Sequence, residues 1–436
     1  MAGDEEQMTD ERRPKADHER ETNDKERPGS PGGSLLTSSS VPSLPSSVRP
    51  PSSGSRGPWI DHFGDNFLWS NAILIIKGMA PYGVVALEEM DRACERLRLR
   101  QHEPQAWWEE WGALAGEVER KAEAAAAAGR QSTAGDYYLR AGNYYYNAER
   151  FILPGDEKRE WGRKAYRCYH AGIRLRHPNI EFVEVPYAGL TLPALLMKAP
   201  VAGPAPTVVI VNGMDNAKEM SIFFAGLEFA RRGMHTLAID GPGQGESLRL
   251  RGIYSRYDYE VPGAAAFDYV AGRREVDAKR VAIMGYSFGG YYAARIAAFE
   301  KRYAACIALS ALHWDLAGWQ QRIKEKNQRD PKSVAQSNFQ FQWVVNAATP
   351  EAAIEIAKKF SLADVAKNIT CPFLVTHGGN DRVVPVENAQ KLYDAVGSAR
   401  KTIKIFSAED GGAEHAHVDN RQVGIDFAAD WLAENL

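Results

Sequence analysis

Short apolar segments alternate with helical segments along the second half of the chain. The runs TVVIVNG, MHTLAIDG, RVAIMG, AACIALSA and CPFLVTHG are read as strands. They alternate with stretches read as helices, namely KEMSIFFAGLEFARRG (residues 218–233), AAAFDYVAGR, SFGGYYAARIAAF and VENAQKLYDAV. Strands that are apolar throughout are typical of a parallel sheet covered by helices on both faces. Before this alternation, IEFVEVPY and LTLPALLM favour an antiparallel pair that opens the sheet. We therefore predict an α/β fold built on a mostly parallel, doubly wound sheet.

The alternation fills only part of the 436 residues, and further regions are expected before it and within it. Residues 1–58 are rich in charge and then in Pro, Ser and Gly, so they have too little apolar surface to offset the entropy of ordering and are predicted to be a disordered tail. Residues 59–177 show helical spacing, which predicts a helical lid domain. Its Trp and Tyr clusters favour a helical core, with an aromatic pocket as the alternative. Residues 178–436 form the sheet domain, interrupted by a helical insertion at about 311–366.

Composition limits the partners of the chain. The formal net charge is −3 and no basic face is visible, so nucleic acid is not expected to bind and a small molecule is the expected partner. The four cysteines lie far apart, which is unlike a zinc site or a disulfide scaffold and favours reduced thiols. No apolar run approaches the roughly 18 residues of a membrane span, and the N-terminus is charged. We expect a soluble cytoplasmic protein without metal or cofactor; a homodimer stays open.

One motif carries a specific chemical prediction. Gly285-Tyr286-Ser287-Phe288-Gly289-Gly290 lies between the strand VAIMG and the helix YYAARIAAF. G-x-S-x-G in a strand–turn–helix context is typical of a nucleophile elbow, where small residues allow a sharp turn that exposes the serine hydroxyl. Ser287 is therefore the candidate nucleophile.

A serine hydroxyl needs a base within hydrogen-bond reach and an acid that orients the base. Asp381 follows the strand PFLVTHG, and His415 and His417 follow the strand KTIKIFS, which reproduces the order Ser, acid, His. One of the two histidines should be the base. The oxyanion donors are expected to be the backbone N–H groups of Phe288, directly after the nucleophile, and of Met214 in the loop after TVVIV.

A second glycine-rich segment, Asp240 to Ser247, superficially matches a phosphate-binding loop. It has no following lysine, and we expect no helix directly behind it, so a nucleotide site is rejected. The segment is interpreted as a structural turn that shapes one wall near the site.

The chain resembles one branch of the α/β-hydrolases. The resemblance rests on a helical N-terminal domain followed by the motifs V-N-G-M-D-N-A-K-E, I-D-G-P-G-Q-G-E-S, G-Y-S-F-G-G, H-G-G-N-D-R-V-V-P and G-A-E-H. That branch contains 2,6-dihydroxypseudooxynicotine hydrolase, the fungal yellowish-green polyketide-shortening hydrolases and FrsA-type esterase-like proteins, and the resemblance spans roughly residues 60–436.

The resemblance implies an α/β-hydrolase fold and a Ser-Asp-His triad at Ser287, Asp381 and His415. In the best-understood members of the branch, the enzyme cleaves a carbon–carbon bond beside a ketone with the help of further acidic residues. By motif position these acids match Asp215 or Glu219, and Asp315.

Three functions stay open at this point. The first is cleavage of a C–C bond next to a ketone in an aromatic or polyketide-like substrate. The second keeps the same triad and hydrolyses an ester, thioester or amide, whose leaving group needs no carbanion stabilisation. The third is a hydrolase-like binding protein without activity, which the intact Ser287, Asp381 and His415 disfavour.

Overall fold

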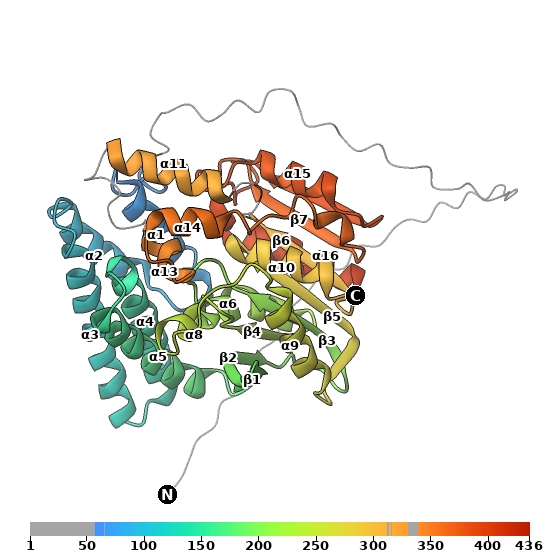
Figure 1. Cartoon of the computed structure of the whole chain (residues 1–436). Helices are drawn as coiled ribbons and strands as arrows, with labels where there is room; N and C mark the ends of the chain where they lie inside the picture. The colour runs from blue at the N-terminus through green and yellow to red at the C-terminus, as the bar shows by residue number, and fades with distance from the viewer. Residues whose placement is uncertain (1–56, 65, 312–313, 315, 330–338) are drawn as a thin grey trace, which may run out of the picture. The chain divides into compact units, whose positions relative to one another are not determined.

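The computed structural model describes residues 57–64, 66–311, 314, 316–329 and 339–436 (Figure 1). The described residues all belong to one compact unit, Pro50–Leu436. The predicted tail, except its last two residues, lies outside the described residues, as does Asp315. No described helix is long and apolar enough to span a bilayer.

The described chain contains an eight-stranded sheet in the order β1-β2-β4-β3-β5-β6-β7-β8. β1 pairs antiparallel with β2, and β2 antiparallel with β4; all the other neighbouring strands are parallel. The mostly parallel sheet opened by an antiparallel pair is therefore confirmed. The strands are β1 (Ile180–Tyr187), β2 (Leu190–Met197), β3 (Ala205–Val211), β4 (His235–Ile239), β5 (Val276–Tyr286), β6 (Ala305–Leu309), β7 (Phe373–Gly378) and β8 (Lys401–Phe406).

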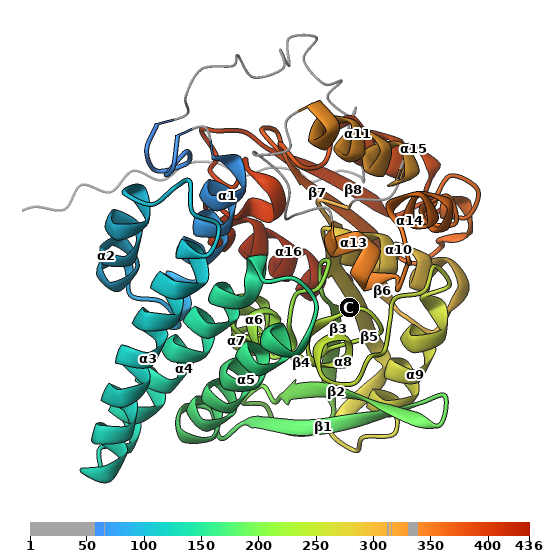
Figure 2. The ribbon, with the colours of Figure 1, turned by 60° about the vertical axis from the view of Figure 1, so that its left-hand side comes forward.

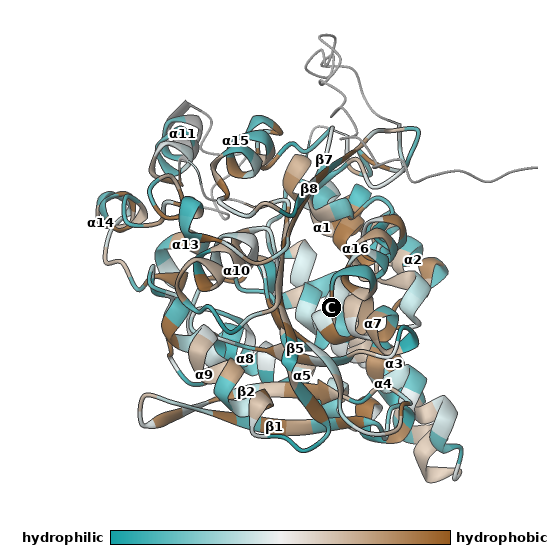
Figure 3. Cartoon of the chain, turned by 90° about the vertical axis from the view of Figure 1, so that its right-hand side faces the viewer, coloured by the Kyte–Doolittle hydropathy of each residue, from teal (hydrophilic) through white to brown (hydrophobic). Residues whose placement is uncertain are grey.

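The central strands are apolar throughout because both faces of the sheet are covered. On β3, Val208 and Ile210 pack into one hydrophobic core, and Val209 and Val211 into a second core on the opposite face. Figure 3 shows α7 and α16 on one side of the strands and α9 and α10 on the other. Alternating side chains of one strand thus stabilise two helical layers, which is the reason for the unbroken apolar runs in the sequence.

The helices of the sheet region follow the strands as the spacing predicts, with two differences. Residues 218–233, expected to be one helix, contain a π-helical turn at Ile222–Gly226. In addition, α8 begins at Gly245, so the glycine-rich segment does have a helix directly behind it, contrary to expectation. The helices are α6 (Lys218–Ser221), η3 (Ile222–Gly226), α7 (Leu227–Arg231), α8 (Gly245–Arg249), α9 (Glu260–Ala271), α10 (Phe288–Phe299), α11 (Leu316–Arg329), α13 (Phe339–Val344), α14 (Pro350–Ala357), η4 (Ala366–Asn368), α15 (Glu387–Ala395), η5 (His415–His417) and α16 (Arg421–Asn435).

The N-terminal part of the described chain is helical. In Figure 2, α3, α4 and α5 lie side by side next to the sheet. Trp107, Trp111 and Tyr144 are fully buried and pack ring against ring, so these aromatics form helical core. The helices are α1 (Phe67–Lys77), η1 (Ala80–Tyr82), α2 (Leu87–Arg98), α3 (Ala106–Ala127), α4 (Gln131–Ala148), η2 (Glu149–Phe151) and α5 (Asp156–Arg176). We call Phe67–Arg176 the helical segment.

Candidate active site

Ser287 stands on a strained turn at the carboxyl end of β5, immediately before α10. Its backbone has φ 56° and ψ −124°, a conformation that costs energy and is typical of the nucleophile elbow expected from the motif. The neighbouring glycines are required by close approach: a Cβ on Gly285 would lie 1.9 Å from the Gly289 carbonyl oxygen, and one on Gly289 would lie 2.4 Å from that of Asn212. The motif therefore folds sharply because backbone packs directly on backbone.

Ser287, His415 and Asp381 form one hydrogen-bonded chain. His415 Nε2 lies 2.8 Å from Ser287 Oγ, and His415 Nδ1 lies 2.7 Å from Asp381 Oδ2. The His415 side chain is 12% exposed and that of Asp381 is fully buried. The three residues come from the loops after β5, β7 and β8, which meet at one edge because the strands are parallel.

Asp381 is held as a carboxylate. Its second oxygen, Oδ1, accepts hydrogen bonds from the backbone N–H groups of Val383 and Val384, both at 2.8 Å. Burial acts to raise the pKa of Asp381, but His415 and His377, together with the Val384 N–H, hold this pKa below its ordinary value. An ionised acid at this point keeps the His415 ring oriented with Nδ1–H toward Asp381 and Nε2 toward the serine.

The loop that carries His415 is fixed by side chains that sequence reasoning missed. Asp419 accepts hydrogen bonds from the N–H groups of Ala413 and Glu414, at 3.0 and 2.9 Å. The Ala416 N–H donates to Ser310 Oγ at 3.0 Å. Ala416 has φ 52°, so these contacts hold a backbone conformation that L-residues rarely adopt. The single signal in the sequence is an aspartate shortly after the histidine, which is too common to single out.

His417 turns away from the serine into the interior. It is 1% exposed, with Nδ1 2.6 Å from the Gly412 carbonyl oxygen and Nε2 3.1 Å from Thr376 Oγ1. Burial lowers its pKa to about 4, so this ring is neutral at physiological pH. Of the two candidate bases, the hydrogen-bonded geometry thus favours His415.

The predicted oxyanion loop lies against the elbow. A Cβ on Gly213 would lie 3.3 Å from Ser287 Cβ, so the backbone of this loop passes directly beside the serine. Met214 is partly buried in the second core, and Phe288 is fully buried as the first residue of α10. Asn216, two residues after Met214, donates from Nδ2 to the Tyr286 hydroxyl at 2.8 Å and ties the loop to the elbow.

Asp215, expected to be an auxiliary acid, belongs to a buried ionic cluster. Arg249 donates to the Asp215 carbonyl oxygen at 2.7 Å, to its carboxylate at 3.2 Å, and to Glu149 Oε1 at 2.6 and 2.9 Å. Lys158 lies 2.5 Å from Glu149 Oε2, and Tyr146 donates to the Asp215 carbonyl oxygen at 2.7 Å. The cluster therefore joins η2, α4 and α5 to the loop that carries Met214.

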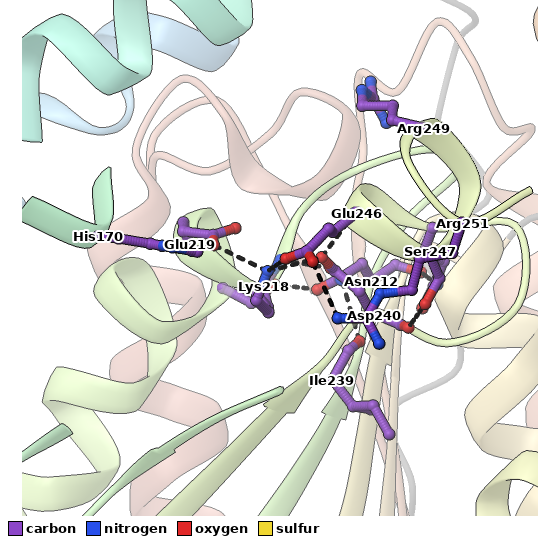
Figure 4. Close-up of polar contacts among 12 residues, drawn as sticks. His170, Asn212, Lys218, Glu219, Ile239, Asp240, Glu246, Ser247, Arg249 and Arg251 are labelled. Carbon is purple, nitrogen blue, oxygen red and sulfur yellow. Dashed lines mark hydrogen bonds and ion pairs between the residues drawn. The ribbon is translucent and has the colours of Figure 1, made fainter. Parts of the chain in front are cut away.

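Glu219 belongs to a second buried cluster, centred on Lys218. In Figure 4 the side chains of Glu219, Asp240 and Glu246 converge on the Lys218 ammonium, at 2.9, 3.1 and 3.0 Å. His170 of α5 lies 3.2 Å from Glu219 Oε1, which is a second contact between the helical segment and the sheet region. Burial raises the pKa of Asp240 above its ordinary value, although Lys218 opposes the shift. Glu219 Oε1 is thus paired with Lys218 and His170, whereas Oε2 is buried without a hydrogen-bond partner among the described residues.

Asp240 also explains the glycine-rich segment. Its carboxylate accepts hydrogen bonds from the N–H groups of Lys218 and Glu246, at 2.7 and 2.8 Å. A Cβ on Gly245 would lie 2.1 Å from Asp240 Oδ2. The Asp240 carboxylate therefore lies where a phosphate-binding loop would hold its ligand, which agrees with the rejection of a nucleotide site. The expectation that no helix follows this segment was wrong, because α8 begins at Gly245.

Comparison with known proteins agrees with this architecture. A family model described as serine aminopeptidase, S33, matches residues 202–409. The hydrolase LUC6 of a Fusarium species is 30% identical over 79% of this chain and 91% of its own length. The 2,6-dihydropseudooxynicotine hydrolase of Paenarthrobacter nicotinovorans is 29% identical over 64% of this chain and 71% of its own length. A crystal structure of 2,6-dihydroxy-pseudo-oxynicotine hydrolase has a TM-score of 0.68 and 26% identity, and covers 82% of this chain and 95% of that one.

These relatives match the helical segment together with the sheet region, since they cover most of both chains. The predicted branch is confirmed, and with it the prediction that the chain is an enzyme. The protein is a hydrolase of the α/β-hydrolase family, in the branch that includes LUC6 and 2,6-dihydropseudooxynicotine hydrolase.

Proposed function

We propose that this hydrolase acts through Ser287 as nucleophile, His415 as general base and acid, and Asp381 as the group that orients the imidazole. The observation that carries the proposal is the pair of short contacts from His415 to Ser287 Oγ and to Asp381, at 2.8 and 2.7 Å. The strained φ of Ser287 supports it, because a serine held in this conformation without a function would only destabilise the fold.

In the proposed reaction, Ser287 Oγ attacks the substrate carbonyl carbon while His415 Nε2 takes the hydroxyl proton. The tetrahedral oxyanion accepts hydrogen bonds from the backbone N–H groups of Met214 and Phe288. Collapse breaks the bond to the leaving group, which receives the proton from His415. Water, deprotonated by His415, then hydrolyses the acyl-enzyme and regenerates Ser287.

We further propose that the bond cleaved is a C–C bond next to a ketone, in an aromatic or polyketide-like substrate. A carbon leaving group departs as a carbanion equivalent, so it has to be protonated in a site that excludes bulk water. The contacts of the helical segment with the catalytic loops support such a site: Tyr146 reaches the oxyanion loop. Arg382, next to Asp381, pairs at 2.7 Å with Asp61, which precedes α1. Ester, thioester or amide hydrolysis by the same triad is the alternative.

A substrate panel separates the two bond classes. Purified protein is incubated with aryl β-diketones and with p-nitrophenyl esters of matched acyl groups, and the products are identified by mass spectrometry. C–C cleavage predicts a carboxylic acid and a methyl ketone from each diketone at rates above those for the esters. Rapid ester turnover with no diketone product would contradict C–C cleavage and favour the alternative. Ser287→Ala should abolish either activity.

A further inference from the structure

Arg421, the first residue of α16, is a buried cation without an anion. Its side chain is 4% exposed, and it has neither an ion pair nor a hydrogen bond with any residue that the structure describes. Its Nε atom is fully buried and unpaired. A Cβ on Gly78 would lie 2.9 Å from this atom, so a glycine at the end of α1 leaves the space that the arginine needs. The side chain is thus accommodated although nothing in the described chain neutralises it.

Such a cation is costly for the fold. An arginine stays charged when it is buried, and desolvation of an unpaired charge costs several kcal/mol. The first turn of a helix adds to this cost, because the helix dipole is positive there. The cation–π contact with Phe224, whose ring centroid lies 4.7 Å from the guanidinium, offsets only part of this cost. Burial acts to lower the pKa of Arg421, as expected for a charge with no partner.

The described groups that act electrostatically on Arg421 itself include no carboxylate. The hydroxyl of Tyr82 is also buried without a hydrogen-bond partner among the described residues, and the charges that act on it are those of Arg421 and Arg231 and of the acids Glu228 and Asp426. The other charged or titratable neighbours that act on Arg421 are Tyr286 and Arg150. Arg421 Nε and the Tyr82 hydroxyl are therefore two buried donors without a hydrogen-bond partner among the described residues, and Arg150 adds positive charge rather than neutralising Arg421.

Arg421 is connected by packing to the turn that carries Ser287. Phe224, on which Arg421 stacks, also packs edge-on against Tyr286 with ring centroids 5.1 Å apart. Tyr286 directly precedes Ser287, and its hydroxyl accepts from Asn216 of the oxyanion loop at 2.8 Å. The α16 helix itself begins shortly after the loop that carries His415.

We propose that Arg421, assisted by the Tyr82 hydroxyl, binds a carboxylate group on the substrate. The guanidinium offers paired N–H donors that match the two oxygens of a carboxylate, and Tyr82 adds a third donor. This inference rests on the proposed function, because it assigns the bound carboxylate to the same molecule that Ser287 attacks. The substrate class is then an acidic one, a ketone or acyl compound that carries a second, ionised group.

The binding test uses full-length Ser287→Ala protein, so that turnover does not interfere. The probes are benzoate and its neutral analogue benzamide, followed by thermal shift and titration calorimetry. Benzoate is expected to raise Tm and benzamide to leave it unchanged. Arg421→Met should weaken benzoate binding about 10- to 100-fold, and without benzoate its Tm should equal or exceed that of the parent, because an unpaired buried charge is removed. Tyr82→Phe, which keeps the ring, should weaken benzoate binding about 5-fold.

The matched control is Arg163→Met, which removes an arginine whose side chain is 59% exposed and should change neither measurement. Unchanged benzoate binding in both Arg421→Met and Tyr82→Phe would overturn the proposal, as would equal binding of benzamide. A Tm rise with chloride or phosphate equal to that with benzoate would show an unspecific anion site and overturn the substrate assignment. Failure of the proposed triad has a different signature, namely substrate turnover that survives Ser287→Ala.

Discussion

Replacing Arg249 with methionine should lower the free energy of unfolding by about 3–5 kcal/mol, because it removes one partner from a buried ion pair. The Arg249 side chain is 1% exposed and donates to Glu149 Oε1 and to both the carbonyl and the carboxylate of Asp215. Methionine fills a similar volume but donates no hydrogen bond. Among the described residues, the Glu149 carboxylate would keep only its contact with Lys158, and the Asp215 carboxylate only its hydrogen bond from Gln340 at 2.6 Å.

The loss should be visible as a shift of the thermal midpoint. A folded part of roughly 380 residues loses about 0.8 kcal/mol of stability per degree near Tm, so the expected fall is about 4–6 °C. Tyr146→Phe should cost only about 1 kcal/mol, because the Asp215 carbonyl oxygen that loses the tyrosine donor still accepts from Arg249. Arg163→Met, which breaks an exposed pair with Glu160, should cost less than about 0.5 kcal/mol.

Differential scanning fluorimetry and urea titration of the three variants check this order. An Arg249→Met protein that melts within one degree of the parent would refute the reasoning, since it would mean that the buried carboxylates need no partner. Equal losses in Arg249→Met and Arg163→Met would refute it as well.

Ser287→Ala should leave Tm unchanged and lower turnover by several orders of magnitude, and it should abolish covalent labelling by a fluorophosphonate; labelling at another serine would contradict the assignment. His415→Ala should lose activity with the fold intact, whereas His417→Ala, in the interior, should lose stability. The pKa of His417 lies at about 4, below the 6.5 of an unfolded histidine, so the unfolded state binds the additional proton and stability falls as pH drops from 6.5 toward 4. His417→Asn should flatten this slope by up to about 1.4 kcal/mol per pH unit in urea titrations, and an unchanged slope would contradict a buried neutral ring.

The strands could be predicted because their signals are local. The ranges read from the sequence for β1 and β2 agree with the structure residue for residue, since alternation and flanking turn residues define an antiparallel pair within one short segment. The α1 helix, FLWSNAILIIK, was not singled out because it is apolar on nearly all sides and has no helical period. The π-helical turn at Ile222–Gly226 could not be predicted for a related reason. It adds one residue to a helical turn, and in a continuous apolar segment this does not change the pattern of apolar and polar residues.

Some residues of the candidate site could likewise be predicted from the sequence, and others could not. Ser287, Asp381 and His415 could be proposed because each follows a strand in the order that the fold requires. Asp215 and Glu219 were expected to be auxiliary acids, and their pairing with Arg249 and Lys218 could not be predicted. Arg249 follows Asp215 by 34 residues, so the sequence gives no sign of this pair. Lys218 directly precedes Glu219, but adjacent residues of a helix do not ordinarily face each other, so this pair could not be read from the sequence either.

The buried charges bear on how a substrate reaches Ser287. Moving the helical segment away from the catalytic loops would separate Glu149 from Arg249 and Tyr146 from the Asp215 carbonyl oxygen. Breaking the ion pair alone would cost about 3–5 kcal/mol of free energy. At equilibrium, fewer than about one molecule in a hundred would have the helical segment separated from these loops. Separation of the whole helical segment is therefore rare. A cavity of about 440 Å³ lies beside the cluster, with Lys158, Arg249 and Trp343 in its lining. Trp343 contacts the Arg249 guanidinium through a cation–π interaction, 5.5 Å from the ring centroid, and not through an ion pair, so a movement of this ring alone would leave each ion pair of the cluster in place.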